Sequence, residues 1–160
     1  MTARVSPAAS LLPDGTTLVA GGWGGVPPIP GQAPSTTAEI YHPANPIKAP
    51  ALLTTSTGQA VVWNGVTGAF VSPGGAFVPA QAGDILSTYT NNLIEGGMIP
   101  PQVSVGGKAA KILYFGDAPD YPGYFQINFQ VPVGVTAGSS VPVVLSYIGR
   151  SSNTVMIGVQ

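Results

Sequence analysis

The chain contains no cysteine, which excludes disulfide bridges and metal sites built on thiolates. Charge is also scarce, because Asp, Glu, Lys and Arg make up 7% of the 160 residues, against roughly 25% in an average soluble protein. Five scattered cations cannot form the basic stripe that nucleic-acid phosphates require, so we expect no nucleic-acid partner. A net charge of −1 leaves little repulsion between copies, which favours self-association.

Long apolar runs are missing as well. The longest, at residues 141–145, is interrupted by Pro142, so the sequence predicts no membrane-spanning segment. The apolar stretch of a secretion signal does not follow Arg4, because serines and prolines recur throughout residues 6–13. Either export is signalled elsewhere or Met1 is not the true start of the protein.

Apolar residues nevertheless supply 44% of the chain, which is enough to form a buried core. The clearest pattern is an alternation of two sets of side chains: Tyr124, Gln126, Asn128 and Gln130 with Phe125, Ile127, Phe129 and Val131. Because side chains on a strand point alternately to opposite faces, this pattern predicts a strand with one apolar face and one amide face. It carries no acid, base or nucleophile, which favours packing or binding over catalysis.

Three prolines between residues 43 and 50 predict a stiff connector that cannot lie inside a central strand. We therefore expect an N-terminal piece at residues 1–45, a linker at 46–54 and a larger domain at 55–160.

The N-terminal piece has the pattern of a β-hairpin. Residues 8–12 and 17–20 flank Pro13-Asp14-Gly15, in which the proline fixes φ and the glycine accepts a positive φ. Residues 38–41 predict a third short strand.

The C-terminal domain has the pattern of strands throughout, with no helical periodicity. The predicted strands are residues 59–63, 66–71, 84–90, 102–105, 109–115, 124–131, 141–147 and 153–159. Asn64-Gly65 and Gly106-Gly107 are typical turns between them. This spacing predicts an all-β fold, an antiparallel immunoglobulin-like (Ig-like) sandwich, with a small barrel as the alternative.

Four segments of the N-terminal piece carry a family resemblance: Met-Thr-Ala-Arg at 1–4, Leu-Leu-Pro-Asp-Gly at 11–15, Leu-Val-Ala-Gly-Gly at 18–22, and Ala-Glu-Ile-Tyr at 38–41 followed by Pro43. Together they resemble a bacterial kelch repeat, one blade of a β-propeller. A single blade cannot close a ring, so the resemblance implies the last blade of a longer protein, a remnant, or a sheet that packs on another subunit. It also implies that Met1 is internal to a longer secreted chain.

The C-terminal domain carries a second set of matching residues: Gly58-Gln59-Ala60, Trp63-Asn64, Pro79-Ala80, Gly83-Asp84-Ile85, Val105-Gly106-Gly107, Ala109, Leu113-Tyr114, Pro122-Gly-Tyr-Phe-Gln-Ile-Asn128, Val131-Pro132, Gly138 and Ser152-Asn153. In this order they resemble the C-terminal domain, first described in Solibacter, of many large secreted acidobacterial proteins. The resemblance implies an Ig-like domain of extracellular proteins and assigns no chemistry to it.

Catalytic groups are sparse. His42 is the only histidine, so no two-histidine metal site is predicted, and we interpret His42 as a turn residue. No serine lies in a nucleophile-elbow motif, and no two acids show a reason to pair as in glycosidases. We therefore expect no enzymatic activity and no cofactor.

Asp117 and Asp120 are the weak candidates for a metal site. They lie in one loop around Pro119 and would offer two carboxylates to Ca²⁺. Two carboxylates make a weak cage, so we favour their interpretation as caps of tight turns.

Aromatic side chains offer flat surfaces of the kind that bind sugars: Trp23, Trp63, Tyr89, Tyr114, Tyr121 and Tyr124. We expect Trp63 to pack between sheets. Tyr121 and Tyr124 are the best candidates for ligand binding. The adjoining amides of Gln126 and Asn128 suit sugar hydroxyls, and they suit a neighbouring strand or loop equally well.

These observations predict an extracellular or cell-surface structural protein that assembles with copies of itself, as a filament or surface layer, by sharing β-strands. The residues expected at the contact between copies are Leu11, Leu12, Leu18, Val19, Trp23, Ile40 and Tyr41. The alternative is a terminal adhesion or carbohydrate-binding module of a longer secreted kelch-propeller protein, with a cell-surface glycan as its partner.

Overall fold

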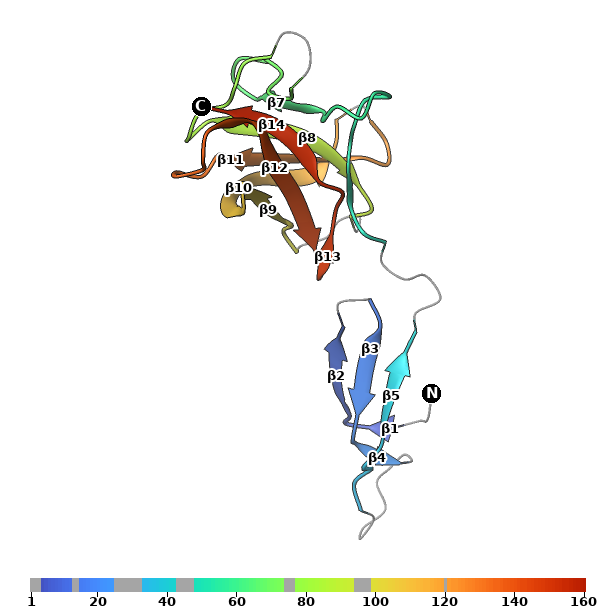
Figure 1. Cartoon of the computed structure of the whole chain (residues 1–160). Coiled ribbons are helices and arrows are strands. Elements are labelled where there is room, and N and C mark those ends of the chain that lie inside the picture. Colours follow the sequence, from blue (N-terminus) through green and yellow to red (C-terminus); the bar gives the residue numbers. More distant parts are fainter. Residues whose placement is uncertain are drawn as a thin grey trace. The chain divides into compact units, whose positions relative to one another are not determined.

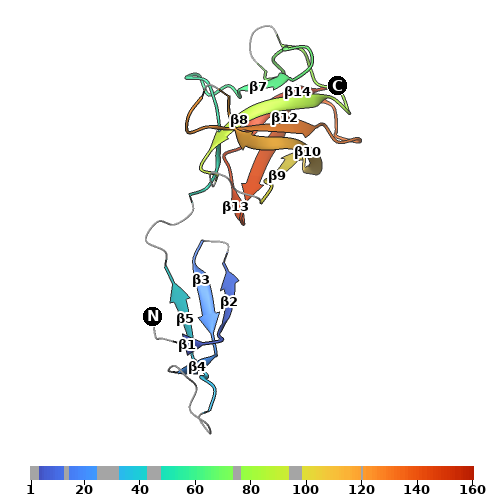
Figure 2. The same ribbon diagram turned by 180° about the vertical axis from the view of Figure 1, so that it is seen from behind.

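The computed structural model describes residues 4–12, 15–24, 33–42, 48–73, 77–93, 99–119 and 121–160. The chain divides into two units, Met1–Ile47 and Lys48–Gln160, drawn in Figure 1 and from behind in Figure 2. The described residues contain strands and no helix, which confirms the all-β prediction. Among them, accordingly, no helix suited to crossing a membrane is found.

The first unit is built on a three-stranded antiparallel sheet. Its strands are β2 (Ala8–Leu11), β3 (Thr17–Ala20) and β5 (Ala38–Tyr41), with β3 in the centre, while β1 (Arg4–Val5) pairs with β4 (Trp23–Gly24). The predicted hairpin and third strand are therefore confirmed. Gly15, the last residue of the predicted turn, has a φ of 83°, which glycine adopts without strain, while Pro13 and Asp14 lie outside the described residues.

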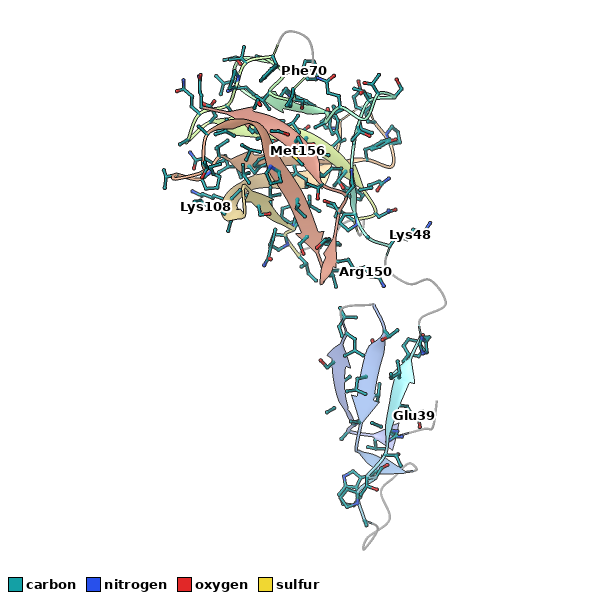
Figure 3. The ribbon with its side chains drawn as sticks, viewed as in Figure 1. Glu39, Lys48, Phe70, Lys108, Arg150 and Met156 are labelled. Carbon is teal, nitrogen blue, oxygen red and sulfur yellow. The ribbon has the colours of Figure 1, made fainter. Side chains whose placement is uncertain are left out.

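Arg4 ties β1 to the three-stranded sheet. Its Nη1 donates hydrogen bonds to Gly21 O (3.0 Å), Ser35 Oγ (3.1 Å) and Thr37 O (2.9 Å). Its Nη2 donates to Thr37 Oγ1 (2.8 Å) and pairs with Glu39 Oε1 (2.7 Å) on β5, where Figure 3 labels Glu39. The Arg4 side chain is 4% exposed, whereas no residue of β2, β3 or β5 is buried. The hydrogen bonds of this guanidinium therefore hold the strands of the first unit together, a role that an apolar core has in a larger domain.

The second unit contains one large antiparallel sheet of nine strands. They are β6 (Ala51–Leu52), β7 (Val62–Asn64), β8 (Ile85–Asn91), β9 (Gln102–Val105), β10 (Lys108–Asp117), β11 (Phe125–Gln130), β12 (Gly138–Tyr147), β13 (Arg150–Ser151) and β14 (Val155–Val159). The order is β13-β12-β9-β10-β11-β8-β6, with β14 also paired to β12 and β7 also paired to β8.

The large sheet curls into a half-barrel around its core (Figures 1 and 2). Val71 and Ala80 hydrogen-bond to β7 and β14, the two strands that branch from the main order of the sheet. Val71 N donates to Val62 O on β7 (3.2 Å), and Gly158 N on β14 donates to Val71 O (2.7 Å). Ala80 N in turn donates to Gly158 O (2.9 Å). These bonds satisfy backbone groups that an open sheet edge would leave exposed.

β11 has the alternation that the sequence predicts. Phe125, Ile127 and Phe129 are buried in the core, whereas Gln126 and Asn128 lie half-buried on the opposite face. The core cluster gathers apolar side chains from around the half-barrel: Leu52, Ala60, Val62, Val71, Ala80, Leu86, Val103, Val105, Ile127, Phe129, Val131, Val141, Val143, Leu145, Tyr147, Val155, Ile157 and Val159.

The predicted strand at residues 66–71 is wrong. Asn64 Oδ1 accepts hydrogen bonds from Val66 N (2.9 Å) and Thr67 N (3.0 Å), which turns the chain directly after β7. Val66 is consequently 79% exposed, and pairing with β7 is confined to residues 69–71, through the bridge between Trp63 and Phe70 and the bonds from Asn64 N to Ala69 O (2.8 Å) and from Val71 N to Val62 O (3.2 Å). A side-chain bond of asparagine outweighs the strand preference of valine at this point.

The expected linker at residues 46–54 extends too far, because β6 falls within it. The Asn153 side chain pins β6 from a distant turn: its Oδ1 accepts from Leu52 N (2.8 Å) and its Nδ2 donates to Leu52 O (3.1 Å). Leu52 is buried and belongs to the core of the second unit.

Replacing Phe129 tests the core. Phe129→Ala removes a ring with 0% exposure and leaves a cavity, so we expect the free energy of unfolding of the second unit to fall by about 3–5 kcal/mol. Phe70→Ala is the matched control, since Phe70 is 51% exposed (labelled in Figure 3), and it should change stability by less than about 1 kcal/mol. Chemical denaturation measures both, and equal losses would contradict this core.

Replacing Arg4 tests the cohesion of the first unit. Arg4→Met keeps the length of the side chain but removes its hydrogen bonds, so we expect amide exchange of Val19 and Glu39 to accelerate about tenfold or more. Amides of β11, in the other unit, are the internal control and should not change. Exchange rates of Val19 and Glu39 like those of the unchanged protein would show that Arg4 does not hold the sheet.

Candidate functional site

A polar and aromatic surface covers the outer face of the half-barrel where β7, β8, β11 and β10 are neighbours. Its members are Trp63, Ser87, Tyr89, Tyr114, Tyr121, Gln126 and Asn128, and we call it the amide–aromatic face. Strand pairing sets Asn128 between Ser87 and Tyr114, and sets Gln126 beside Tyr89. The opposite side chains of β11 fill the core, so this face lies on the outside of the sheet.

The amides of this face hold one another in place. Asn128 Oδ1 accepts hydrogen bonds from Gln126 Nε2 (2.9 Å) and from Ser87 Oγ (2.9 Å). This arrangement fixes the orientation of both amide groups. It leaves Gln126 Oε1 and Asn128 Nδ2 without a hydrogen bond to any described residue, so one acceptor and one donor stay available.

Three aromatic rings lie next to the amides on the side of β8. The centroids of Trp63 and Tyr89 are 5.1 Å apart with an interplanar angle of 61°. Tyr121, from the loop before β11, lies 5.6 Å from Tyr89 at 43°. Trp63 is half-buried and is not part of the core cluster, so the expectation that it packs between sheets is wrong. Its pairing with Ser87 places it on the outer face.

A fourth ring, Tyr114, lies on the other side of the amides, on β10. A Cβ at Gly116 would lie 2.8 Å from the Tyr114 hydroxyl, so the ring occupies the space that glycine leaves over the strand. The hydroxyl donates to Asp117 O at 3.3 Å. A register shift between Ile112 and Tyr114 brings Tyr114 onto this face and leaves it 43% exposed.

The loop between β10 and β11 forms a shallow pocket of about 270 Å³ at one end of this face. Its lining residues are Asp117, Ala118, Tyr121, Pro122, Gly123, Tyr124 and Phe125. Consecutive turns shape it: Tyr121 N donates to Ala118 O (3.3 Å), and Tyr124 N donates to Tyr121 O (3.1 Å). Of the residues expected to bind a ligand, Tyr121, Gln126 and Asn128 therefore lie on one face, and Tyr124 lines the adjoining pocket.

Tyr89 and Tyr114 were named among the aromatic candidates, but Tyr121 and Tyr124 were preferred to them as ligand-binding residues. The sequence of β8 does not show which of its residues face the core, because polar residues occupy both faces of the strand. Thr88 and Thr90 are buried, and their hydroxyls donate to Val61 O (2.9 Å) and Ala51 O (3.0 Å). A strand whose buried residues are polar shows no apolar alternation. Only the pairing of Tyr89 with Gln126 indicates that Tyr89 lies on the outer face.

The residues expected at the contact between copies divide between the two faces of the small sheet. Pairing puts these side chains on one face, which we call the bare face: Ala8, Ser10, Leu18, Ala20, Ala38 and Ile40. Leu11, Val19 and Tyr41 lie on the opposite face, with Glu39. Leu12 follows β2 and Trp23 belongs to β4, both half-buried, so neither lies in the three-stranded sheet.

Both outer edges of the small sheet have unpaired backbone groups within the described residues. Gly21 N donates a hydrogen bond to Thr37 O. Bonded and non-bonded pairs alternate along an antiparallel ladder, so the backbone groups of Glu39 and Tyr41 also bond to β3. The N–H and C=O groups of Ala38 and Ile40 therefore point outward from the sheet edge. By the same alternation, residues 9 and 11 direct theirs outward from β2.

The acids and the histidine are dispersed in the described part of the chain. Asp117 is exposed at the end of β10, and Asp120, the other weak Ca²⁺ candidate, lies outside the described residues. His42 is exposed directly after β5. Among the described residues, no three His, Asp or Glu side chains gather as a metal site requires.

No protein-family model matches the chain, and no curated protein or solved structure is significantly similar to it. Two surfaces of the described residues are candidates for function: the small sheet of the first unit and the amide–aromatic face of the second.

Asn128→Ala tests the amide network. It removes the acceptor shared by Gln126 and Ser87, and since Ser87 is buried, we expect a loss of about 1–3 kcal/mol in the free energy of unfolding. Gln130→Ala is the matched control, because the Gln130 bond to Gly83 O is exposed and should contribute less than about 1 kcal/mol. Denaturation curves compare the two, and a smaller loss for Asn128→Ala would contradict the network.

Proposed function

We propose that this protein is a non-enzymatic structural subunit that assembles with copies of itself outside the cell through the sheet of its first unit. The observation that carries the proposal is that β2, β3 and β5 bury no side chain while the bare face is almost entirely apolar. Apolar side chains on a sheet this small gain stability only when another surface covers them.

The size of the sheet indicates what kind of contact this is. Three strands about 4.8 Å apart, each about 14 Å long, give a face of roughly 200 Å². Two such faces packed together remove about 400 Å² from water, well below the ~1,200 Å² of a small specific interface. Face packing alone therefore does not hold two copies, and pairing along the sheet edges adds the hydrogen bonds and area that are lacking.

The two edges of the sheet favour a polymer. β2 and β5 both run antiparallel to β3 and so run in the same direction. β5 of one copy can thus pair in parallel with β2 of the next by simple translation, and such a contact repeats without closing. Pairing of β5 with β5 of a second copy is antiparallel, and it stops at a dimer as long as the β2 edges stay unpaired.

Low charge also supports this proposal, since a chain with 7% charged residues opposes self-association weakly. In this proposal the first unit, which resembles a kelch blade, shares its strand edges, and the second unit, an Ig-like domain, is the body that each subunit adds to the assembly.

Ala38→Pro tests strand sharing. Proline removes the outward N–H of Ala38 and leaves the bonds between β3 and β5 in place, so we expect the dissociation constant between copies to rise about tenfold or more. Ala38→Ser keeps the N–H and is the matched control. Sedimentation velocity over a concentration series, with electron microscopy, measures association and shows whether the product is a filament or a dimer.

Filaments of the unchanged protein and of Ala38→Ser, lost in Ala38→Pro, would support the proposal. A monodisperse monomer up to the solubility limit would overturn it.

A further inference from the structure

We infer that the amide–aromatic face of the second unit binds a neutral carbohydrate chain. This inference is independent of the proposed assembly, because it rests on residues of the other unit.

The aromatic side chains of this face are positioned to stack on sugar rings. Tyr121 is 57% exposed although it packs on Tyr89, which in turn packs on Trp63. Tyr114, two strands away, extends its hydroxyl end over Gly116 and is 43% exposed. Since neighbouring strands are about 4.8 Å apart, rings on β8 and β10 are separated by about 10 Å, with the amides between them. Flat apolar surfaces with polar edges suit the alternating apolar and hydroxyl-bearing faces of pyranose rings.

The amides supply the hydrogen bonds that sugar hydroxyls need. A hydroxyl both donates and accepts, and this face offers it Gln126 Oε1 as an acceptor and Asn128 Nδ2 as a donor. Their orientation is already fixed, because Asn128 Oδ1 is occupied by Gln126 Nε2 and Ser87 Oγ. A ligand therefore finds both groups in place without ordering them, which lowers the entropic cost of binding.

The absence of charge on the face selects against ionic ligands. In the paired rows from Ser87 to Tyr89, across β11 to residues 114–116 of β10, no side chain is charged. A sulfated or carboxylated sugar, a phosphate or an acidic peptide would lose hydration there without gaining a counter-charge. A peptide strand, in addition, binds at a free sheet edge, whereas this surface is the middle of a paired sheet.

Titration calorimetry of the full chain with neutral oligosaccharides tests the site. The probes are hexamers of β-1,4-linked glucose, α-1,4-linked glucose and β-1,4-linked N-acetylglucosamine. We expect at least one to bind with a dissociation constant between about 1 µM and 1 mM, the range of open sites with few hydrogen bonds. Tyr121→Ala and Tyr114→Ala should each weaken that binding about tenfold. Both residues are exposed, so folding is preserved, and circular dichroism checks it.

Met156→Ala is the control, since Met156 is an exposed large side chain of β14, which pairs with no strand of the amide–aromatic face, and it should leave sugar affinity unchanged. Failure of all three hexamers to bind at millimolar concentration would overturn the inference, as would equal affinity in Tyr121→Ala and the unchanged protein. Tighter binding of a sulfated hexamer than of its neutral parent would overturn the claim of neutrality. None of these results alters the state of assembly, which sedimentation of the same samples reports separately.

Discussion

The register of β11 is the constraint on which the second unit depends. This strand lies between β8 and β10, buries Phe125, Ile127 and Phe129, and presents Gln126 and Asn128 outward. A slip by one residue would put the amides into the core and the phenylalanines on the surface. Burial of two phenylalanines thus fixes the position of the amides. Burial of the apolar side chains of β11 therefore also places the amides on the candidate binding face.

The first unit is held by a different kind of force. No residue of its three-stranded sheet is buried. The Arg4 guanidinium joins β1 to this sheet through side-chain hydrogen bonds to Gly21, Ser35, Thr37 and Glu39. Hydrogen bonds each contribute about 1 kcal/mol net, far less than a packed core of the size found in the second unit. The small sheet of the first unit therefore gains more stability from a covering surface than the second unit does. In the proposed assembly, another copy of the protein supplies that surface.

Sequence patterns predicted best the elements that short-range signals define. The hairpin of β2 and β3, the strand β5 and the alternation of β11 were all predicted correctly, because turn residues or strict alternation define them locally. The strand at residues 66–71 was predicted wrongly because the turn expected at Asn64-Gly65 extends to Thr67, where the Asn64 side chain accepts hydrogen bonds from Val66 N and Thr67 N.

The candidate binding face was predicted in part for the same reason. Gln126 and Asn128 belong to the well-patterned strand, and Tyr121 adjoins it. Trp63 and Tyr114 reach the face through long-range pairing and a register shift, neither of which is encoded in local spacing. Pairing between strands far apart in sequence therefore marks the limit of what the pattern alone could show.

The two proposed properties strengthen each other if both hold. An open face with two oriented amide groups and a few rings binds a sugar weakly, because little of the ligand is enclosed. A polymer of copies presents that face once per subunit, and a polysaccharide presents its repeating sugar many times. Once one subunit is bound, its neighbours meet the same chain at high effective concentration, so avidity can exceed the single-site affinity by about two to four orders of magnitude. Weak sites on one unit thus become useful when the other unit assembles, and a monomer with the same face would hold a surface glycan only briefly.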